Sequence, residues 1–210
     1  VAGKVSANDK FSPTNQTRNL SFSSQILEFH VGAEYDLINS YEHRVSPYLF
    51  AALAGYHFSP YTFDTSNKKT FLQPLGTEGQ GFYAGRKKYG LTQLAIPFGG
   101  GLKFGLTDNI HIRIEAALRV LLTDYLDDVS STYADENDLL INNGAKAAEL
   151  AFRSDEINPA LTPVPGGIRG NPKSKDFYYT TGISVSFRLN SGDGGRKPGK
   201  SKLGCPVNVY

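Results

Sequence analysis

Apolar and polar residues alternate along residues 27–37, LEFHVGAEYDL. Glu28, His30, Gly32, Glu34 and Asp36 occupy every second position, and the positions between them are apolar or aromatic. Because successive side chains of a β-strand point to opposite faces, this pattern predicts a strand with one apolar and one charged face. The apolar face comprises Leu27, Phe29, Val31, Ala33, Tyr35 and Leu37.

The same alternation returns in four further segments and predicts a strand in each. They are 11 to 13 residues long, whereas strands of soluble domains usually have about 5–6 residues. A tilted strand that crosses a bilayer needs roughly 9–11 residues, so the length favours a membrane barrel. Residues 1–6 are expected to be the end of another strand. The four segments are 47–58, 94–106, 110–120 and 177–189, and a tight TDN hairpin at 107–109 joins the second to the third.

The connections between these segments differ strongly in length. Residues 38–46 and 107–109 are short, while 59–92 and 123–175 are long and rich in Gly, Pro, Asn and charge. Short turns on one side and long loops on the other are typical of outer-membrane barrels. Within the second long loop, AKAAELAFR at 145–153 has a helix-forming composition and predicts a short helix.

The predicted fold is therefore all-β: an antiparallel transmembrane β-barrel over residues 1–189, followed by a basic tail at 190–210. We expect eight strands in the complete barrel and about six in this chain, because such barrels have an even count. A soluble barrel with its apolar residues inside is the alternative. Aromatic residues near strand ends, where interfacial girdles belong, favour the membrane barrel. These residues are Tyr48, Phe58, Phe177, Tyr179 and Phe187.

The charged face of each strand is expected to line the barrel interior. A small barrel is just wide enough for side chains to fill, and buried charges are tolerated when they are paired. Acidic residues of 27–37 should therefore pair with basic residues of the other strands and close any water path. The expected interior charges are Glu28, His30, Glu34, Asp36, Lys103, His111, Arg113, Glu115, Arg119 and Arg188.

Composition excludes some functions. The 210 residues include 22 Lys and Arg against 20 Asp and Glu, a net charge of +2 that does not indicate nucleic-acid binding. The single cysteine, Cys205, cannot form an intramolecular disulfide. No apolar run approaches the roughly 20 residues of a membrane helix, and no signal peptide is visible. Because Met is absent even at position 1, we expect a processed or incomplete N-terminus.

One acidic segment is a candidate for binding. TDYLDDVSSTY at 123–133 carries three aspartates that could hold a divalent cation, but its spacing is not that of an EF-hand and we expect no metal or cofactor. A partner contact, a network that orders the loop and a solvated turn remain open. The candidate contacts are Asp124, Tyr125, Leu126, Asp127 and Asp128.

No catalytic residue is expected. His30 and His111 fit satisfied interior histidines, His57 has no recognisable partner, and no G-x-S-x-G motif occurs. GTEGQGFYAG at 76–85 lacks the Lys-Ser/Thr of a phosphate loop, so its glycines more simply let the loop fold back over the barrel mouth.

The basic tail has two interpretations: a solvated linker, or a segment that docks on an acidic partner. Its basic residues are Arg196, Lys197, Lys200 and Lys202.

The last predicted strand resembles the C-terminal signal that the bacterial barrel-assembly machinery reads, a polar-x-Gly-x-x-apolar-x-aromatic pattern. It is matched by Thr180, Gly182, Val185 and Phe187.

Five loop segments carry a more specific resemblance. RNLSF (18–22), LQPLGTEGQG (72–81), KKYGLTQLAIPFG (87–99), TDYLDDVSSTY (123–133) and RGNPKSKDFYY (169–179), followed by GCP (204–206), resemble the PorG family over nearly the whole chain. PorG is the outer-membrane barrel component of the type IX secretion system of Bacteroidota.

The resemblance implies a non-enzymatic subunit that associates, at the periplasmic side of the outer membrane, with the ring of PorK and PorN. That ring belongs to the apparatus that exports folded proteins with a C-terminal sorting domain. The tail is then expected in the periplasm. An outer-membrane adhesin or receptor barrel and a barrel hydrolase are the alternatives.

Overall fold

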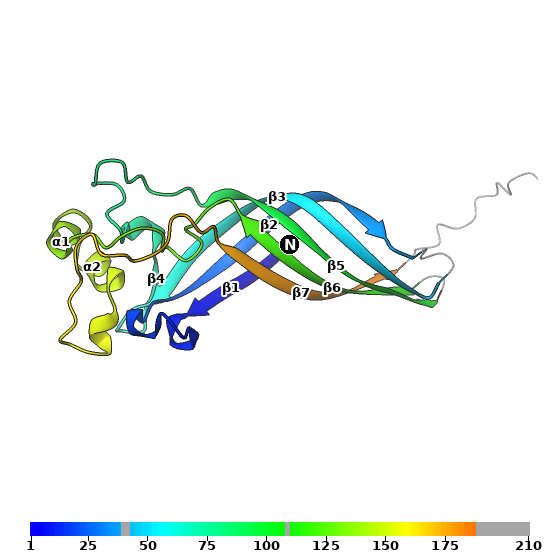
Figure 1. Ribbon diagram of the computed structural model, residues 1–210, viewed down its shortest axis with the longest axis horizontal. Helices are drawn as coiled ribbons and strands as arrows, with labels where there is room; N and C mark the ends of the chain where they lie inside the picture. The colour runs from blue at the N-terminus through cyan, green and yellow to red at the C-terminus, as the bar shows by residue number, and fades with distance from the viewer. Residues whose placement is uncertain (39–42, 108–109, 188–210) are drawn as a thin grey trace, which may run out of the picture.

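The computed structural model describes residues 1–38, 43–107 and 110–187, and these form a mostly β protein with two short helices (Figure 1). Six antiparallel strands lie in the order β1-β2-β3-β5-β6-β7 and make a nearly closed, barrel-like sheet, while the short β4 pairs with β3 beyond it. The strands are β1 (Ala2–Asn8), β2 (Ser21–Asp36), β3 (Val45–Phe63), β4 (Lys69–Phe71), β5 (Thr92–Thr107), β6 (Ile110–Leu121) and β7 (Phe177–Phe187).

The predicted strands are confirmed, and several are longer than the alternation indicated. β3 continues through Ser59 and Pro60 to Phe63, and β2 begins at Ser21. Among the described residues, β5 ends at Thr107 and β6 begins at Ile110, so the connection between them is short. The eight-strand count of a complete barrel stays a prediction.

The long loops fold together at one end of the sheet, and we call this part of the molecule the cap (residues 64–91 and 122–176; Figure 1). The helix predicted at 145–153 is confirmed as α2 (Ala145–Ala151). A second helix, α1 (Glu136–Asn143), was not predicted; it begins where the Asp135 side chain accepts hydrogen bonds from the first backbone N–H groups. The part of the chain that the structure describes also contains four 3₁₀ turns: η1 (Asp9–Phe11), η2 (Gln16–Arg18), η3 (Gln73–Leu75) and η4 (Ser154–Glu156).

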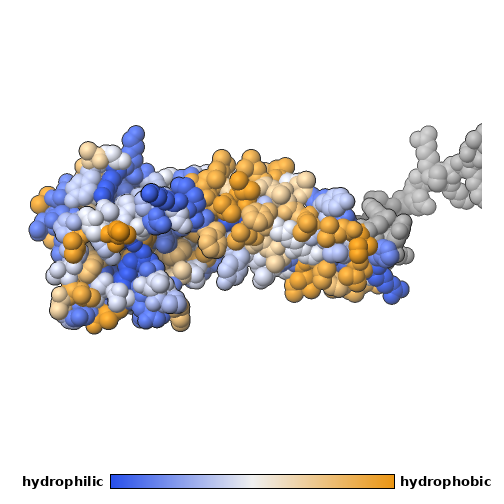
Figure 2. Space-filling view, in the orientation of Figure 1, coloured by the Kyte–Doolittle hydropathy of each residue, from blue (hydrophilic) through white to orange (hydrophobic). Residues whose placement is uncertain are grey.

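The apolar face of most strands points outward. Phe29 of β2 is 77% exposed and Ile183 of β7 is 75% exposed, whereas Glu28, next to Phe29 in the chain and on the opposite face of β2, is 4% exposed. Apolar side chains therefore gather along the length of the strands in Figure 2, while the cap end is more hydrophilic. The inward face combines charges such as Glu28 and Arg119 with buried apolar side chains such as Leu121.

β3 corrects one part of this prediction. Tyr48 and Phe58, expected in an outward aromatic girdle, are 1% and 0% exposed and lie inside the barrel. The register explains the reversal: Leu27 pairs with His57, so the odd-numbered residues of β3 share the outward face and the even-numbered aromatics turn inward. Phe177, Tyr179 and Phe187 of β7 are exposed on the outer face as expected.

Glycines of β5 make room for an interior tyrosine. A Cβ at Gly101 would lie 2.1 Å from the carbonyl oxygen of Ile114 and 2.9 Å from the ring of Tyr48. Only glycine therefore allows Tyr48 to cross the interior at this level, where its hydroxyl donates to Glu115 at 2.7 Å.

Candidate functional site

The barrel interior next to the cap is organised around one buried carboxylate, that of Glu28 on β2. Arg119 of β6 donates from Nε to Glu28 Oε2 at 2.8 Å, and the Tyr178 hydroxyl of β7 donates to the same oxygen at 3.1 Å. His30 Nδ1 lies 3.0 Å from Oε1. Arg119 also donates to the hydroxyl of Thr180. The charges are thus paired and hydrogen-bonded, which is the condition under which buried ions are tolerated.

A second interior cluster lies nearer the short turns. Lys103 of β5 pairs with both Glu34 and Asp36 of β2, and Arg113 of β6 lies 3.2 Å from Glu34. The Lys103 ammonium and the Arg113 guanidinium each lie 5.0 Å from the centre of the Tyr48 ring. Five strand-borne groups therefore lie together at the same level of the barrel, where the side chains of Lys103, Glu34 and Asp36 remain 20–30% exposed.

The other expected interior residues are placed as follows. Glu115 accepts the hydrogen bond from Tyr48, and His111 lies opposite Gly105 in the β5–β6 ladder. Arg188 lies outside the described residues. Aromatic rings complete the filling, since Tyr56 and Phe58 are at most 1% exposed.

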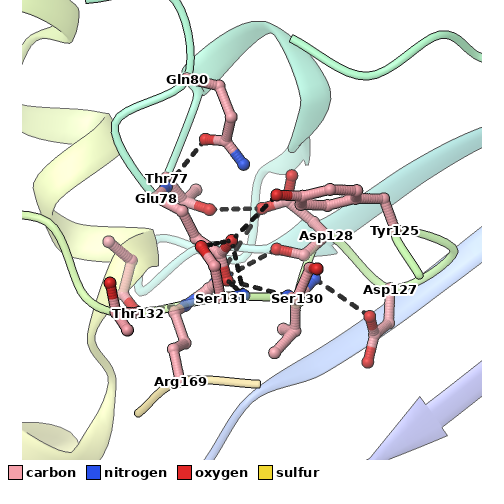
Figure 3. A network of polar contacts seen from close by, with 12 residues as sticks. Thr77, Glu78, Gln80, Tyr125, Asp127, Asp128, Ser130, Ser131, Thr132 and Arg169 are labelled. Carbon is pink, nitrogen blue, oxygen red and sulfur yellow. Dashed lines mark hydrogen bonds and ion pairs between the residues drawn. The ribbon is translucent and has the colours of Figure 1, made fainter. Parts of the chain in front are cut away.

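The cap has its own buried polar centre, which joins three segments of the two long loops (Figure 3). Glu78 is fully buried and accepts hydrogen bonds from the backbone N–H groups of Ser130 and Ser131 at 2.9 and 3.1 Å. Arg169, 3% exposed, donates from Nη1 to Glu78 at 3.0 Å and also to the backbone carbonyl of Asp128. One carboxylate thereby fixes residues that are far apart in the sequence.

Asp128 is the second carboxylate of this centre. It is fully buried, adopts a left-handed backbone (φ 67°), and accepts hydrogen bonds from Thr77 at 2.6 Å and Tyr89 at 2.7 Å. Burial raises the pKa of Asp128 to about 6, although Arg169, Thr77 and Tyr89 oppose the shift. Burial and the neighbouring Asp128 likewise raise the pKa of Tyr89.

The candidate contact segment 124–128 is therefore largely internal. Asp124, Leu126 and Asp128 are at most 8% exposed, and this burial agrees with the loop-ordering alternative rather than with a solvated turn. Asp127 points away from the Glu78 centre (Figure 3) and accepts a hydrogen bond from the N–H of Val129. In this structure the segment holds the cap together and offers few atoms to a partner.

Two further carboxyl groups lie where the cap meets β7. Burial, followed by the charge of Asp176, raises the pKa of Asp127 to about 7. Burial raises the pKa of Asp176 to about 6, against the hydrogen bond from the N–H of Leu126 at 2.8 Å. Burial also raises the pKa of Asp124. Its Oδ2 atom has no hydrogen-bond partner among the described residues.

Several residues of these buried centres could not be predicted from the sequence. Glu78 and Arg169 lie within the motif segments 72–81 and 169–179, but nothing in these segments predicts that the two residues pair. Tyr48 is predicted only as an outward girdle aromatic, and no role is predicted for Tyr178. The available signal was that Glu78 is the single acidic residue of its glycine-rich segment 72–81, which does not identify a partner.

Thr180, Gly182, Val185 and Phe187, expected to carry the assembly signal, all lie on β7, with Val185 and Phe187 exposed on its outer face. The tail residues Arg196, Lys197, Lys200 and Lys202 lie outside the described residues.

Fold and interior define a barrel-like protein whose interior holds paired charges beside buried aromatic and aliphatic side chains, and whose outer face is apolar. The chain matches no protein-family model, and comparisons with curated proteins and with solved structures found no match. The resemblance to the PorG family therefore stays a prediction. Within residues 1–38, 43–107 and 110–187, no helix has the length and apolarity to cross a membrane, and no group of three or more His, Cys, Asp or Glu is arranged to hold a metal ion.

Proposed function

We propose that this chain is a membrane-spanning β-barrel that serves as a non-enzymatic structural subunit and not as a pore. The observation that carries the proposal is the outward apolar face of the strands, on which side chains such as Phe29 and Tyr179 are more than 70% exposed. Soluble monomers rarely expose contiguous apolar patches beyond a few hundred Å². Contact with the hydrocarbon chains of lipid suits an apolar face of this kind.

The height of the apolar face supports the same conclusion. Leu27 and Leu37, like Phe177 and Phe187, are ten residues apart, and all four are exposed. At about 3.3 Å per residue and a tilt of about 40°, ten residues rise about 25 Å along the barrel axis. This is the height of the apolar band of outer-membrane barrels.

The paired charges and rings of the interior support a plugged barrel. Conductance through it requires breaking pairs such as Arg119–Glu28 and Lys103–Glu34. The purified chain in a planar bilayer should therefore show no stable ion conductance, and steady channel currents would contradict the plug.

The sequence resemblance supports a more specific role, as a subunit of the type IX secretion machinery in the outer membrane. Several segments that carry it build the buried centre of the cap, which includes Glu78, Asp128 and Arg169. Our proposal includes the outer-membrane lipid and, during biogenesis, the barrel-assembly machinery as partners, and a PorK/PorN-like ring in the periplasm. Because short turns are usually periplasmic, the ring contacts would lie at the end of the sheet opposite the cap.

Envelope fractionation and co-purification test this proposal. The affinity-tagged chain, extracted from its native envelope with mild detergent, should be found in the outer-membrane fraction and should retain the ring subunits. A tagged barrel of similar size from the same membrane is the control. Recovery in the outer membrane without ring subunits would refute the secretion role and leave the barrel, whereas recovery as a soluble protein would refute both.

A groove in the cap favours a second candidate, a receptor or adhesin. It measures about 260 Å³ and lies between the two helices and residues 159–163. Leu139, Phe152 and Leu161 are among its lining residues. If the cap binds an external ligand, the tagged chain should capture that ligand from the medium and should not retain ring subunits.

A further inference from the structure

The outer face of the barrel changes from apolar to polar within a few residues on one side of the molecule. One row of residues paired across β1, β2, β3 and β5 is Ala2–Leu27–His57–Thr92. Toward the cap, its Leu27 is the last large apolar side chain on the outer face of β2. The next rows toward the cap are Lys4–Gln25–Ser59 and Ser6–Ser23–Tyr61–Phe71.

Strand geometry sets the height of these rows. Successive outward residues are about 6.6 Å apart along a strand, or about 5 Å along the axis of a barrel tilted by about 40°. The row of Lys4 and the row of Tyr61 therefore lie about 5 and 10 Å beyond the row of Leu27. A bilayer of about 40–45 Å with a hydrocarbon core of about 30 Å has headgroup layers of this depth.

Two lysines meet at one tyrosine in these rows. Lys69 Nζ lies 3.9 Å from the centre of the Tyr61 ring and 4.9 Å from that of Phe71, and Lys4 Nζ lies 5.7 Å from the Tyr61 ring. Both lysines are exposed, and neither forms an ion pair with a described residue. This contrasts with Lys103 and Lys146, each of which pairs with two carboxylates. The positive charge at Tyr61 is thus available to an external anion.

Beside the lysines lies a cleft of about 330 Å³. Ser6 and Ser23 supply hydroxyl groups to its wall, and Tyr61 belongs to both the cleft and the lysine pair. Two phenylalanines at its edge, Phe11 and Phe63, are 88% and 49% exposed. Exposed aromatic side chains at such a boundary are typical anchors at a membrane surface.

We propose that this rim site, comprising Lys4, Lys69, Tyr61 and the adjoining cleft, binds the phosphorylated headgroup of a membrane lipid. Ammonium and hydroxyl groups are donors to phosphate oxygens, and the aromatic rings face the upper acyl chains. The inference rests on the proposed membrane-spanning barrel. With short turns in the periplasm, the site faces the outer leaflet, where the phosphates of lipid A are the matching chemistry.

Lipid binding by the purified full-length chain tests the site. The folded chain in dodecyl maltoside micelles is titrated with diphosphoryl lipid A, and the bound lipid is counted by native mass spectrometry. Because each basic residue near an anionic lipid surface contributes about 1 kcal/mol, Lys4→Ala with Lys69→Ala should weaken binding about 10- to 30-fold. Lys4→Arg with Lys69→Arg should bind within about threefold of the unaltered chain, since both charges remain.

A matched pair controls for net charge. Lys87 and Lys173 are exposed lysines of the cap that do not line the cleft, so Lys87→Ala with Lys173→Ala should leave the affinity unchanged. Equal losses in both pairs would overturn the proposal, because they would indicate non-specific attraction. Equal binding of dephosphorylated lipid A, or displacement of the lipid by millimolar inorganic phosphate, would overturn it as well, as would retention of an acidic protein at the site in place of lipid.

Failure of this inference is distinguishable from failure of the barrel proposal. Each variant is first inserted into phosphatidylethanolamine vesicles, and its resistance to protease and its heat-modifiable migration are compared with those of the unaltered chain. A chain that inserts normally but shows no preference for phosphorylated lipid would contradict the rim site alone. A chain that does not insert at all would contradict the barrel and the rim site together.

Discussion

Arg119 Nε and Glu28 Oε2 lie 2.8 Å apart although β3 and β5 separate their strands in the sheet. In a flat sheet, three strand spacings of about 4.8 Å would hold their backbones about 14 Å apart on the same face. The ion pair forms because the sheet curls and brings β2 and β6 face to face. The pair is thus a direct consequence of barrel formation. It places two opposite charges in the interior, where each is tolerated only because the other is close.

Removing Arg119 should destabilise the barrel strongly. Arg119→Ala leaves Glu28 buried without its cation, and breaking a buried pair in this way costs about 3–5 kcal/mol. The free energy of unfolding, measured by guanidinium titration of the chain in vesicles, should fall by that amount.

The double variant Glu28→Leu with Arg119→Met is the control for this prediction. Replacing both charges by apolar groups removes the uncompensated ion, so the double variant should be markedly more stable than Arg119→Ala. If the double variant is no more stable than Arg119→Ala, Glu28 and Arg119 do not act as a pair.

Gly101 should not tolerate any side chain. Its Cβ would lie 2.1 Å from a backbone oxygen, which cannot move aside as a flexible side chain does. We expect Gly101→Ala to lower the free energy of unfolding by about 1–3 kcal/mol and to displace Tyr48 from Glu115.

Gly55 of β3 offers a matched control, because a Cβ there meets nothing within 4 Å. Gly55→Ala should therefore leave stability nearly unchanged in the same titration. If the two variants behave alike, the close approach of β5 to β6 and Tyr48 does not constrain the barrel.

The alternating pattern of residues 27–37 predicted most of the fold. Leu27 and Phe29 face outward and Glu28 faces inward, as a period of two requires. The same reasoning failed for β3, because both faces of residues 47–58 are apolar or small and the pattern does not distinguish them. Register with β2 decides the orientation there, and register depends on contacts between strands.

The structure of the cap could not be predicted from local sequence patterns, for a different reason. Glu78 and Arg169 are 91 residues apart in the sequence, and each sits in a loop without periodicity. Composition indicated long polar loops, but the buried pair that orders them depends on a tertiary contact. Ser59 and Pro60 likewise have the composition of a turn, yet pairing with β2 extends β3 through them.

The cap should lose stability as the pH rises. The pKa of Asp127 is raised to about 7 and that of Asp176 to about 6, from an ordinary value of 3.8. A carboxyl whose pKa is raised by folding favours the folded state when it is protonated, so its contribution is complete below about pH 4 and is lost as the pH rises through 6 to 7. Arg18 and Arg169 oppose but do not reverse the shift at Asp127.

Hydrogen exchange of residues 123–133, corrected for the intrinsic pH dependence of exchange, measures this effect. Protection should decrease between about pH 4 and pH 7 while β2 and β6 stay protected. Asp127→Asn should reduce the decrease, and Asp155→Asn, at an exposed aspartate of η4, should not. Protection that increases over this range would contradict the assignment.

The basic tail should contribute to ring association if the secretion role is right. Replacing Arg196, Lys197, Lys200 and Lys202 by Gln should weaken recovery of the ring, most clearly at low salt, because clustered charge acts mainly through steering and orientation and is screened at high salt. β7 runs from the cap to the turn end, so Phe187 lies at the end of the sheet that our proposal assigns to the periplasm. Unchanged ring recovery and secretion after deletion of residues 191–210 would show that the tail is only a linker.

Accessibility of the outer face to lipid tests the membrane-spanning barrel most directly. In a Cys205→Ser background, single spin labels are placed at Phe29, Leu53 and Phe98 within the apolar face and at Gln25 and Ser59 in the polar rows beyond it. In vesicles, we expect the first three labels to be reached by oxygen and shielded from a water-soluble nickel reagent, with the reverse at the last two. Equal exposure of all five labels to the nickel reagent would contradict a barrel that crosses the membrane.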